Sequence, residues 1–319
     1  MIGKLDPDAL ATVLARVGAH DDDVVMGPAY GEDAAAIRVG DQLLVVNSDP
    51  LSLARERLGT LAVHVACNDV AASGADPRWL TNVVFLPDDD PETLDVLTRQ
   101  MDEEAESLGV AIVGGHSEYA PALERPMVSL TAMGLADEYV PTGGAEPGDR
   151  VLLTKTAGVE GTAILATDFR DEIDLSDDLL DHAASFFERI SVVPEAAILR
   201  EYATAMHDPT EGGVLNGLVE LATASDVRVE LDDGLPVREE TAAVCDAMGV
   251  DPARIFGSGA LLATVPAAAA DDARAALIEE VVAHDVGVVT DADDGGAGVA
   301  FDGEFYDDPV RDDLYDLWE

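Results

Sequence analysis

Five acidic residues stand out because each lies at the end of a predicted strand or in a turn rich in small residues. They are Asp33, Asp49, Asp69, Glu118 and Asp208. Asp33, Asp69 and Asp208 stand among apolar and small residues, where an unpaired charge is costly. Carboxylate oxygens suit Mg²⁺, which usually joins a few protein ligands to the phosphates of a substrate. We therefore predict a magnesium site, although any one acid among the 65 could be a solvated residue, a cap or a turn former.

Glycine pairs predict the phosphate-binding part of such a site. Gly114-Gly115, Gly212-Gly213 and Gly257-Ser258-Gly259 each stand between a predicted strand and a turn or helix. Gly212-Gly213 opens a predicted helix, whose free N–H groups and dipole favour a phosphate. Turn formation explains any single pair equally well. The run Asp-Pro-Thr-Glu-Gly-Gly (208–213) at a strand-to-helix junction is a more specific signal.

Lysine and histidine add further candidates. Lys4 and Lys155 are the only lysines, against sixteen arginines. Lys155 ends a predicted strand, and its compact ammonium suits a phosphate, although a surface lysine without a function is an equally good interpretation. His116 and His207 lie within the glycine-rich motifs. The candidates for a catalytic role are Glu118, His116 and Asp208.

Several well-defined site motifs are absent from the sequence. It holds no G-x-x-x-x-G-K-[ST] phosphate loop, no G-x-G-x-x-G after a predicted strand, no H-E-x-x-H and no C-x-x-C. It also lacks G-x-S-x-G, which argues against a hydrolase with a nucleophile elbow.

The charge balance restricts the partners. With 18 basic and 65 acidic residues the net charge is −47, which repels both nucleic acid and anionic membrane surfaces. The acids are spread from Asp6 to Glu319, so they do not form a tail. In molar salt the Debye length shrinks to ~3 Å and the carboxylates repel one another weakly. We favour a halophilic protein over an acidic mesophilic one.

Features of the chain also indicate the compartment. Cys67 and Cys245 are too few for a disulfide scaffold, which fits a reducing compartment. The first 18 residues lack the pattern of a signal peptide, and no run of ~18 apolar residues predicts a membrane span. We expect a soluble cytoplasmic protein.

The elements that must position these residues follow from periodicity and from turn signals. A length of 319 residues favours two domains, and the Pro/Gly-rich stretch 140–150 is the best boundary between them. In the first half we predict helices at 6–17 (with Asp6 as N-cap), 58–72 and 91–108, and strands at 42–49, 80–86, 110–113 and 127–136. In the second half we predict strands at 151–155, 227–231 and 259–265 and a closing hairpin of 286–292 with 298–303. The helices predicted there are 158–166, 176–190, 194–204, 213–224, 237–248 and 266–283.

Six motifs in this order resemble the family related to aminoimidazole ribonucleotide (AIR) synthase. They are GEDAAAI, CNDVAASGADPRWL, IVGGHSE, GDRVLLTKTAGVEGTAILA, HDPTEGGVLNGLVELA and GSGALLATV, between residues 31 and 265. Each motif alone is modest, but six in the right order form a strong signal. The branch that the sequence resembles most contains the archaeal type of hydrogenase expression/formation factor.

The resemblance implies a mixed α/β or α+β structure, the PurM-like fold, with two domains at 1–140 and 145–319. It implies that the first domain forms a β-barrel with a second copy, that the second is an α/β sandwich, and that Mg²⁺ and ATP bind between them. We also expect a homodimer because a sheet of four strands leaves open edges and an apolar face. The residues that would bind the cofactor are Asp33, Asn68, Gly114, Gly115, Lys155, Thr210, Gly212 and Gly213.

The implied activity is an ATP-dependent activation or phosphorylation of an oxygen on a small-molecule or protein acceptor, with a maturation protein as a possible partner. Factors of this branch typically end in a cysteine that is carbamoylated and dehydrated, whereas this sequence ends in DDLYDLWE. The acceptor therefore stays open. The alternatives are a small-molecule kinase similar to thiamine-monophosphate kinase, and an ATP-binding assembly or regulatory protein without catalysis. Asp69, beside Asn68 and remote from basic residues, is the carboxylate that we expect to matter most for the metal.

Overall fold

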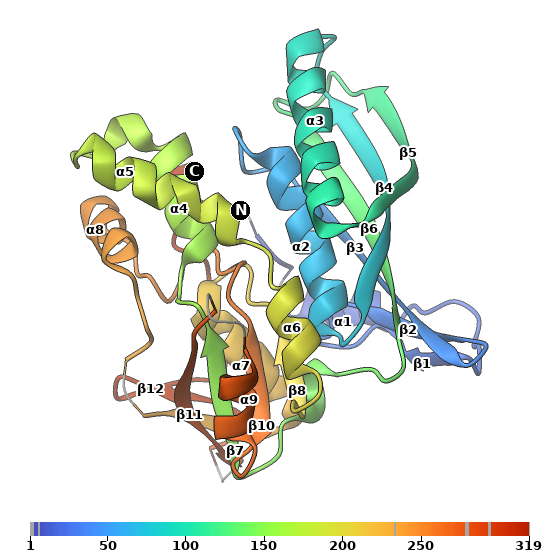
Figure 1. Cartoon of the computed structure of the whole chain (residues 1–319), viewed down its shortest axis with the longest axis vertical. Coiled ribbons are helices and arrows are strands. Elements are labelled where there is room, and N and C mark those ends of the chain that lie inside the picture. The colour runs from blue at the N-terminus through green and yellow to red at the C-terminus, as the bar shows by residue number, and fades with distance from the viewer. Residues whose placement is uncertain (1–2, 6, 233, 278–280, 293–294, 319) are drawn as a thin grey trace.

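The computed structural model describes residues 3–5, 7–232, 234–277, 281–292 and 295–318. These residues form two β-sheets, one from each half of the chain (Figure 1). The predicted N-cap Asp6 lies outside the described residues. Among the described residues, no helix is both long and apolar enough to cross a membrane.

The first sheet has the strand order β1-β2-β3-β6-β4-β5, and only β4 and β5 run parallel to each other. Helices α2 and α3 lie against one face of it (Figure 1). The elements of this half are α1 (Pro7–Leu14), β1 (Val24–Met26), β2 (Ala35–Val39), β3 (Gln42–Leu51), α2 (Leu58–Ala72), β4 (Asp76–Leu86), α3 (Pro91–Leu108), β5 (Ala111–Tyr119) and β6 (Met127–Ala136).

Helix α2 is buried on all sides because it lies between the first sheet and the second half of the chain. All fifteen of its residues are buried, and alanine, glycine and valine let its backbone approach its neighbours closely. A helix that is apolar all round is expected to be buried. Asn68 and Asp69 are therefore polar groups inside the protein, which makes their partners decisive.

The second sheet has the order β13-β12-β9-β11-β7-β10-β8, with β12 and β9 parallel and the other pairs antiparallel. Helix α7 packs on one of its faces, and α6 and α9 pack on the other. Helices α4, α5 and α8 form a further layer together with the C-terminal α10. The elements are β7 (Asp149–Thr154), α4 (Val159–Asp168), α5 (Asp177–Ala184), α6 (Val193–Leu199), β8 (Ala205–His207), α7 (Gly213–Ser225), β9 (Val227–Leu231), α8 (Glu239–Met248), β10 (Leu262–Pro266), α9 (Ala270–Ala276), β11 (Ala283–Asp291), β12 (Gly298–Phe301), β13 (Glu304–Tyr306) and α10 (Tyr315–Trp318). Short 3₁₀ turns lie at Thr142–Gly144, Arg170–Glu172 and Ser185–Arg189.

The predicted long helices and central strands are confirmed, but several short or ambiguous elements differ. Strands β1, β2, β8 and β13 are not in the predictions, because they are short or alanine-rich and their pairing partners supply most of their stability. Among the described residues of the Ala-rich stretch 266–283, only Ala270–Ala276 are helical, since Pro266 still belongs to β10 and β11 begins at Ala283. The predicted hairpin of 286–292 with 298–303 is wrong: β12 pairs with β9 and β13, whereas β11 lies between β9 and β7.

The glycine pair Gly114-Gly115 lies inside strand β5, not in a turn after it, so the strand is longer than predicted. Here the glycines serve close approach between strands. A Cβ atom on Gly115 would lie only 2.3 Å from the carbonyl oxygen of Asn82 on β4, whereas nothing lies within 4 Å of one on Gly114.

This difference predicts that Gly115→Ala lowers the free energy of unfolding by about 1–3 kcal/mol, because β5 must move away from β4. Gly114→Ala is the matched control and should change stability much less. Equilibrium unfolding in denaturant measures both variants. Equal effects of the two substitutions would contradict the assigned β4–β5 contact.

Candidate functional site

Four of the five predicted metal ligands come together where the two halves of the chain meet. Asp33 precedes β2, Asp49 lies on β3, Asp69 on α2, and Asp208 follows β8. The negative charges of Asp33, Asp49 and Asp208 all act on the buried Asp69, which places these four groups within electrostatic reach of one another. We call these four residues the carboxylate cluster.

Burial is the largest factor in the electrostatics of the cluster. It raises the pKa of Asp69 well above its usual value, and the charges of Asp49 and Asp33 raise it further. Burial also raises the pKa of Asp208 well above normal, although the neighbouring His207 charge opposes this. The neighbouring Asp49 raises the pKa of Asp69, whereas Asp69 lowers the pKa of Asp49 against the larger effect of burial. Without a bound cation, these groups therefore hold protons at a pH where exposed carboxyls are ionised.

Unpartnered oxygen atoms in the cluster fit a cation. Asp208 is 1% exposed, and neither of its carboxylate oxygens has a hydrogen bond of normal geometry to a described residue, although the Asn68 side chain lies close enough to lower its pKa. The buried side-chain oxygen of Asn47 likewise has no partner among the described residues. Such orphaned oxygens are costly inside a protein. A hard cation such as Mg²⁺ would satisfy them.

Asn47 was not predicted from the sequence, yet it connects two members of the cluster. Its amide nitrogen donates to Asp69 Oδ2 at 2.6 Å and to the backbone oxygen of Asp33 at 3.0 Å. Asn47 lies two positions before Asp49 on β3, and residues at that spacing share one face of a strand. This two-residue spacing from Asp49 is the sequence feature from which Asn47 could have been predicted.

The structure does not group three His, Cys, Asp or Glu side chains closely enough to enclose a metal ion, as far as the described residues show. Mg²⁺ does not require such a cage, because it usually binds one or two carboxylates and keeps water or substrate phosphates as its other ligands. The orphaned oxygens therefore fit a magnesium ion that arrives with a phosphate ligand.

His207 lies between two carboxylates and connects the cluster to α7. Its Nδ1 is 3.1 Å from Asp33 Oδ2, and its Nε2 is 3.0 Å from Glu220 Oε2. Burial lowers the pKa of His207, but the charges of Asp33 and Glu220 outweigh this and raise it to about 10. Burial raises the pKa of Glu220, but Lys4 and His207 outweigh it and lower it to about 2. The sequence analysis singled out His207 but missed Glu220, which is one more acid on a helix.

The glycines at the start of α7 do not have the free N–H groups that the prediction required. The N–H of Gly212 donates to Asp312 Oδ2 at 2.8 Å, and that of Gly213 donates to the Thr210 carbonyl at 3.1 Å. Their N–H groups are therefore already bonded within the protein, because the C-terminal segment reaches the start of this helix. Burial raises the pKa of Asp312 to about 8. The phosphate role predicted for Gly212 and Gly213 gains no support from this geometry.

Asn68 and Lys155 make contacts that hold the fold together. Asn68 donates to the Ile190 carbonyl and accepts from the Val192 N–H, each at 2.9 Å, so it joins α2 to the second half of the chain. The Lys155 ammonium contacts the carbonyls of Ser191 and Gly259 at 2.7 and 2.8 Å and the Glu195 carboxylate at 2.6 Å. These contacts occupy the groups that we had expected to meet the cofactor.

Glu118 and His116 lie apart from the carboxylate cluster within one chain. Both are exposed on the edge strand β5, where the His116 ring lies 3.3 Å from the Glu118 carboxylate. Gly114 and Gly115 are on the same strand. The cluster thus gathers four of the five predicted metal ligands, and the fifth lies at the far edge of the first sheet.

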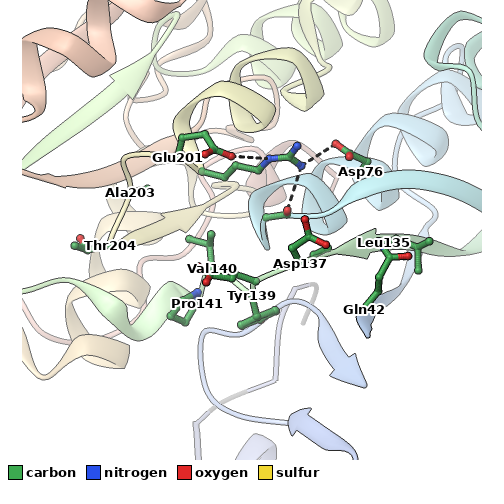
Figure 2. Close-up of a pocket in the computed structure, with 14 residues that line it drawn as sticks. Gln42, Asp76, Leu135, Asp137, Tyr139, Val140, Pro141, Glu201, Ala203 and Thr204 are labelled. Atoms are coloured by element: carbon green, nitrogen blue, oxygen red, sulfur yellow. Dashed lines mark hydrogen bonds and ion pairs between the residues drawn. The ribbon is translucent and has the colours of Figure 1, made fainter. Parts of the chain in front are cut away.

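A polar cavity of about 540 Å³ lies elsewhere, beside the connection between the two halves. Arg200 lies among its lining residues, with Nη1 at 2.8 Å from Asp76 and Nε at 3.8 Å from Glu201; Figure 2 shows these two acids directed at one guanidinium. Tyr139, also in the lining, donates to Glu32 Oε2 at 2.7 Å. None of the predicted site residues lines this cavity, so we place the candidate site at the carboxylate cluster.

Comparison with known families agrees with the fold and the order of motifs. The N-terminal domain of the AIR synthase related proteins matches residues 31–136, and the C-terminal domain matches residues 146–300. The chain belongs to the AIR synthase related family.

Among curated relatives, the carbamoyl dehydratase HypE of Azotobacter vinelandii is 33% identical over 250 residues, which cover 75% of this chain and 69% of that protein. The HypE of Rhizobium leguminosarum bv. viciae is 28% identical over 277 residues, or 80% of this chain and 78% of that one.

Solved structures give the same result for the fold. A hydrogenase maturation protein HypE in complex with ATP has a TM-score of 0.69 at 25% identity, covering 88% of this chain and 82% of that one. A HypE–HypF complex has a TM-score of 0.68 at 26% identity, covering 82% and 87%. The thiamine monophosphate kinase of Aquifex aeolicus, with a TM-score of 0.69 at 23% identity and coverage of 86% and 92%, shows likeness of fold alone.

The raised pKa of Asp69 predicts how one substitution acts on stability. Because the pKa of Asp69 is higher in the folded than in the unfolded state, its proton stabilises the folded protein at low pH. This stabilisation is lost as the pH rises through the folded-state pKa. Asp69→Asn stays neutral, so in metal-free buffer it should melt about 2–5 °C above the parent protein at pH 8 and close to it at pH 5. Melting curves with a chelator present, with the exposed Glu103→Gln as control, measure this. If the melting temperatures of Asp69→Asn and the parent differed by the same amount at both pH values, this would contradict a destabilising charge on the buried Asp69.

Proposed function

We propose that this protein is an ATP-dependent enzyme that uses Mg²⁺ and ATP to activate or phosphorylate an oxygen atom of its acceptor. The observation that carries the proposal is the carboxylate cluster, in which neither carboxylate oxygen of the buried Asp208 has a hydrogen bond of normal geometry to a described residue. Similarity to a HypE crystallised with ATP supports the choice of nucleotide.

In this proposal Asp69 and Asp208 would hold the metal, with Asp33 and Asp49 beside them. Bound Mg²⁺ would offset the charge of the triphosphate and of the buried carboxylates. Asn47 orients Asp69 through its 2.6 Å hydrogen bond, and His207 orients Asp33, whose Oδ2 lies 3.1 Å from the imidazole Nδ1. A metal ion binds the ionised form of a carboxylate, so protons must leave Asp69 and Asp208 when it binds.

We propose domain limits of 1–140 and 145–319, because every described strand of the first sheet ends by Ala136 and every described strand of the second begins at or after Asp149. The cluster then lies between the domains, since Asp208 comes from the second and the other three acids from the first. Similarity to the HypE–HypF complex supports a maturation protein as partner.

A direct test is calorimetric titration with Mg²⁺ and ATP in buffers of low and molar salt. We expect the parent protein to bind. Asp69→Asn should bind at least about 100-fold more weakly, because substitution of groups that only support a metal ligand already costs 10–100-fold. Glu103→Gln on the exposed face of α3 is the control and should bind as the parent does. Folded parent protein without affinity for Mg²⁺ and ATP would overturn the proposal.

The nature of the acceptor is tested by product analysis. If the protein forms ADP with thiamine monophosphate as the acceptor, it belongs to the small-molecule kinases instead. The similarity of fold alone does not favour this outcome. Binding of ATP without turnover in the presence of candidate maturation proteins and carbamoyl donors would assign it to the regulatory class.

We further propose a homodimer in which the first sheets of two copies form a β-barrel. Along β6 the residues alternate between buried and half-buried, so only the face that carries α2 is fully covered. Strand β5 is exposed along its whole length, including Ile112, Val113 and Tyr119. Such an open edge is a template for pairing with another chain. Glu118, His116, Gly114 and Gly115 would then lie at the interface. There Glu118 stays a candidate for the metal, Glu118 and His116 stay candidates for catalysis, and Gly114 and Gly115 stay candidates for binding the cofactor.

The dimer predicts that Val113→Lys, which places a charge on the exposed edge, shifts the protein toward monomer. Light scattering at molar salt measures the mass. Val282→Lys, at a residue of similar exposure in the second half (58% against 56%), serves as control and should leave the mass unchanged. A monomeric parent protein would rule out the dimer.

A further inference from the structure

The segment before α1 brings Lys4 to the edge of the candidate site. Its ammonium nitrogen lies 3.0 Å from Glu220 Oε1 on α7 and 3.6 Å from Glu211 Oε2 in the loop 208–213. The adjacent Gly3 packs so closely on the Tyr315 ring that a Cβ atom there would lie 2.6 Å from it. Contacts with Glu211 and Glu220 and with Tyr315 near the C-terminus therefore hold the N-terminal segment at this position.

Lys4 is connected to the carboxylate cluster through groups of alternating charge. Glu220 contacts Lys4 with one carboxylate oxygen and His207 with the other, and His207 contacts Asp33. Burial lowers the pKa of the Lys4 ammonium, but the charges of Glu220, Glu211 and Asp33 outweigh this and raise it above its usual value. Lys4 in turn lowers the pKa of Asp49 against the larger effect of burial. Two side chains, Glu220 and His207, thus separate Lys4 from Asp33 of the carboxylate cluster.

The two lysines of the chain differ in what their ammonium groups can still bind. Lys155 is 12% exposed and contacts two carbonyls and a carboxylate, which account for its three N–H donors. Lys4 is 44% exposed and contacts two carboxylates, so it keeps donor capacity toward solvent. Of the two lysines, it is therefore Lys4 and not Lys155 whose ammonium group can still bind a phosphate.

We propose that Lys4 binds the terminal phosphate of the nucleotide, and that the N-terminal segment thereby completes the site. This inference rests on the proposed function. The N–H groups of Gly212 and Gly213 are bonded within the protein, so the loop 208–213 leaves a need for another donor. A triphosphate that enters with Mg²⁺ brings more negative charge than either single carboxylate, and an ammonium is a compact point charge suited to it. Glu220 and Glu211 hold Lys4 in place until the phosphate arrives.

The test is a comparison of AMP, ADP and ATP, each titrated with Mg²⁺ into the full-length protein. Lys4→Met should weaken ATP binding by about 10–100-fold, the value of a charged hydrogen bond, and AMP binding by no more than about 2-fold. Lys4→Arg should recover part of the ATP affinity because it keeps the charge. Arg99→Met, which removes a half-exposed positive charge on α3, is the control and should leave all three affinities unchanged.

A ratio of ATP to AMP affinity in Lys4→Met equal to that of the parent would overturn the role of Lys4 while leaving the proposed function intact. Absence of ATP binding by the parent would overturn both. A measurement on the unsubstituted protein covers the case in which Lys4→Met does not fold. Lysine labelled with ¹³C gives NMR signals from only two residues, and the Lys4 signal should shift more on addition of ATP with Mg²⁺ than on addition of AMP with Mg²⁺. Equal shifts with the two nucleotides would count against the phosphate contact.

Discussion

Mutual repulsion among buried carboxylates is the constraint on which the rest of this structure depends. Asp69 is surrounded by apolar residues of α2 and faces Asp33, Asp49 and Asp208. Like charges at such a site raise one another's pKa values, and burial amplifies the effect. The protein stabilises the arrangement with protons held by buried carboxyls of raised pKa, an amide from Asn47, and the imidazole of His207. A bound cation would replace the protons, so the same repulsion that destabilises the metal-free state would provide affinity for a metal.

Contacts between distant segments keep these groups in position. Asn68 joins α2 to residues 190–192, and Asp312 joins the C-terminal segment to the first residues of α7. Asp168 at the end of α4 accepts from the backbone N–H of Arg55, in the loop that follows β3. Each contact connects an element of the candidate site to a part of the chain about 100 residues away or more. Substitutions at these positions are therefore expected to alter the site without touching a ligand.

Only their contacts in the fold distinguish the two lysines as candidates for phosphate binding. Its rarity and its place at the end of a predicted strand made Lys155 a candidate for phosphate binding. In the structure its ammonium is part of the packing between α6 and the loop before β10. Lys4 lies in a segment without any motif. Its suitability for binding a phosphate follows only from the acidic side chains around it. Charge complementarity across the fold decides which lysine can meet a ligand.

The sequence by itself determined the family, the long helices, the central strands and four members of the cluster. These features depend on local patterns: α3 begins after Asp90 with Pro91 and ends at Gly109, as capping requires, and the motif carboxylates stand next to residues that must be buried. Only the tertiary structure decided that Glu118 lies apart from the other four acids, and that Asn47, Glu220 and Lys4 join them. It also decided that the N–H group of Gly212 is bonded to Asp312. The physical reason is that burial, pKa and hydrogen-bond partners are set by residues distant in the chain, which local periodicity and composition do not describe.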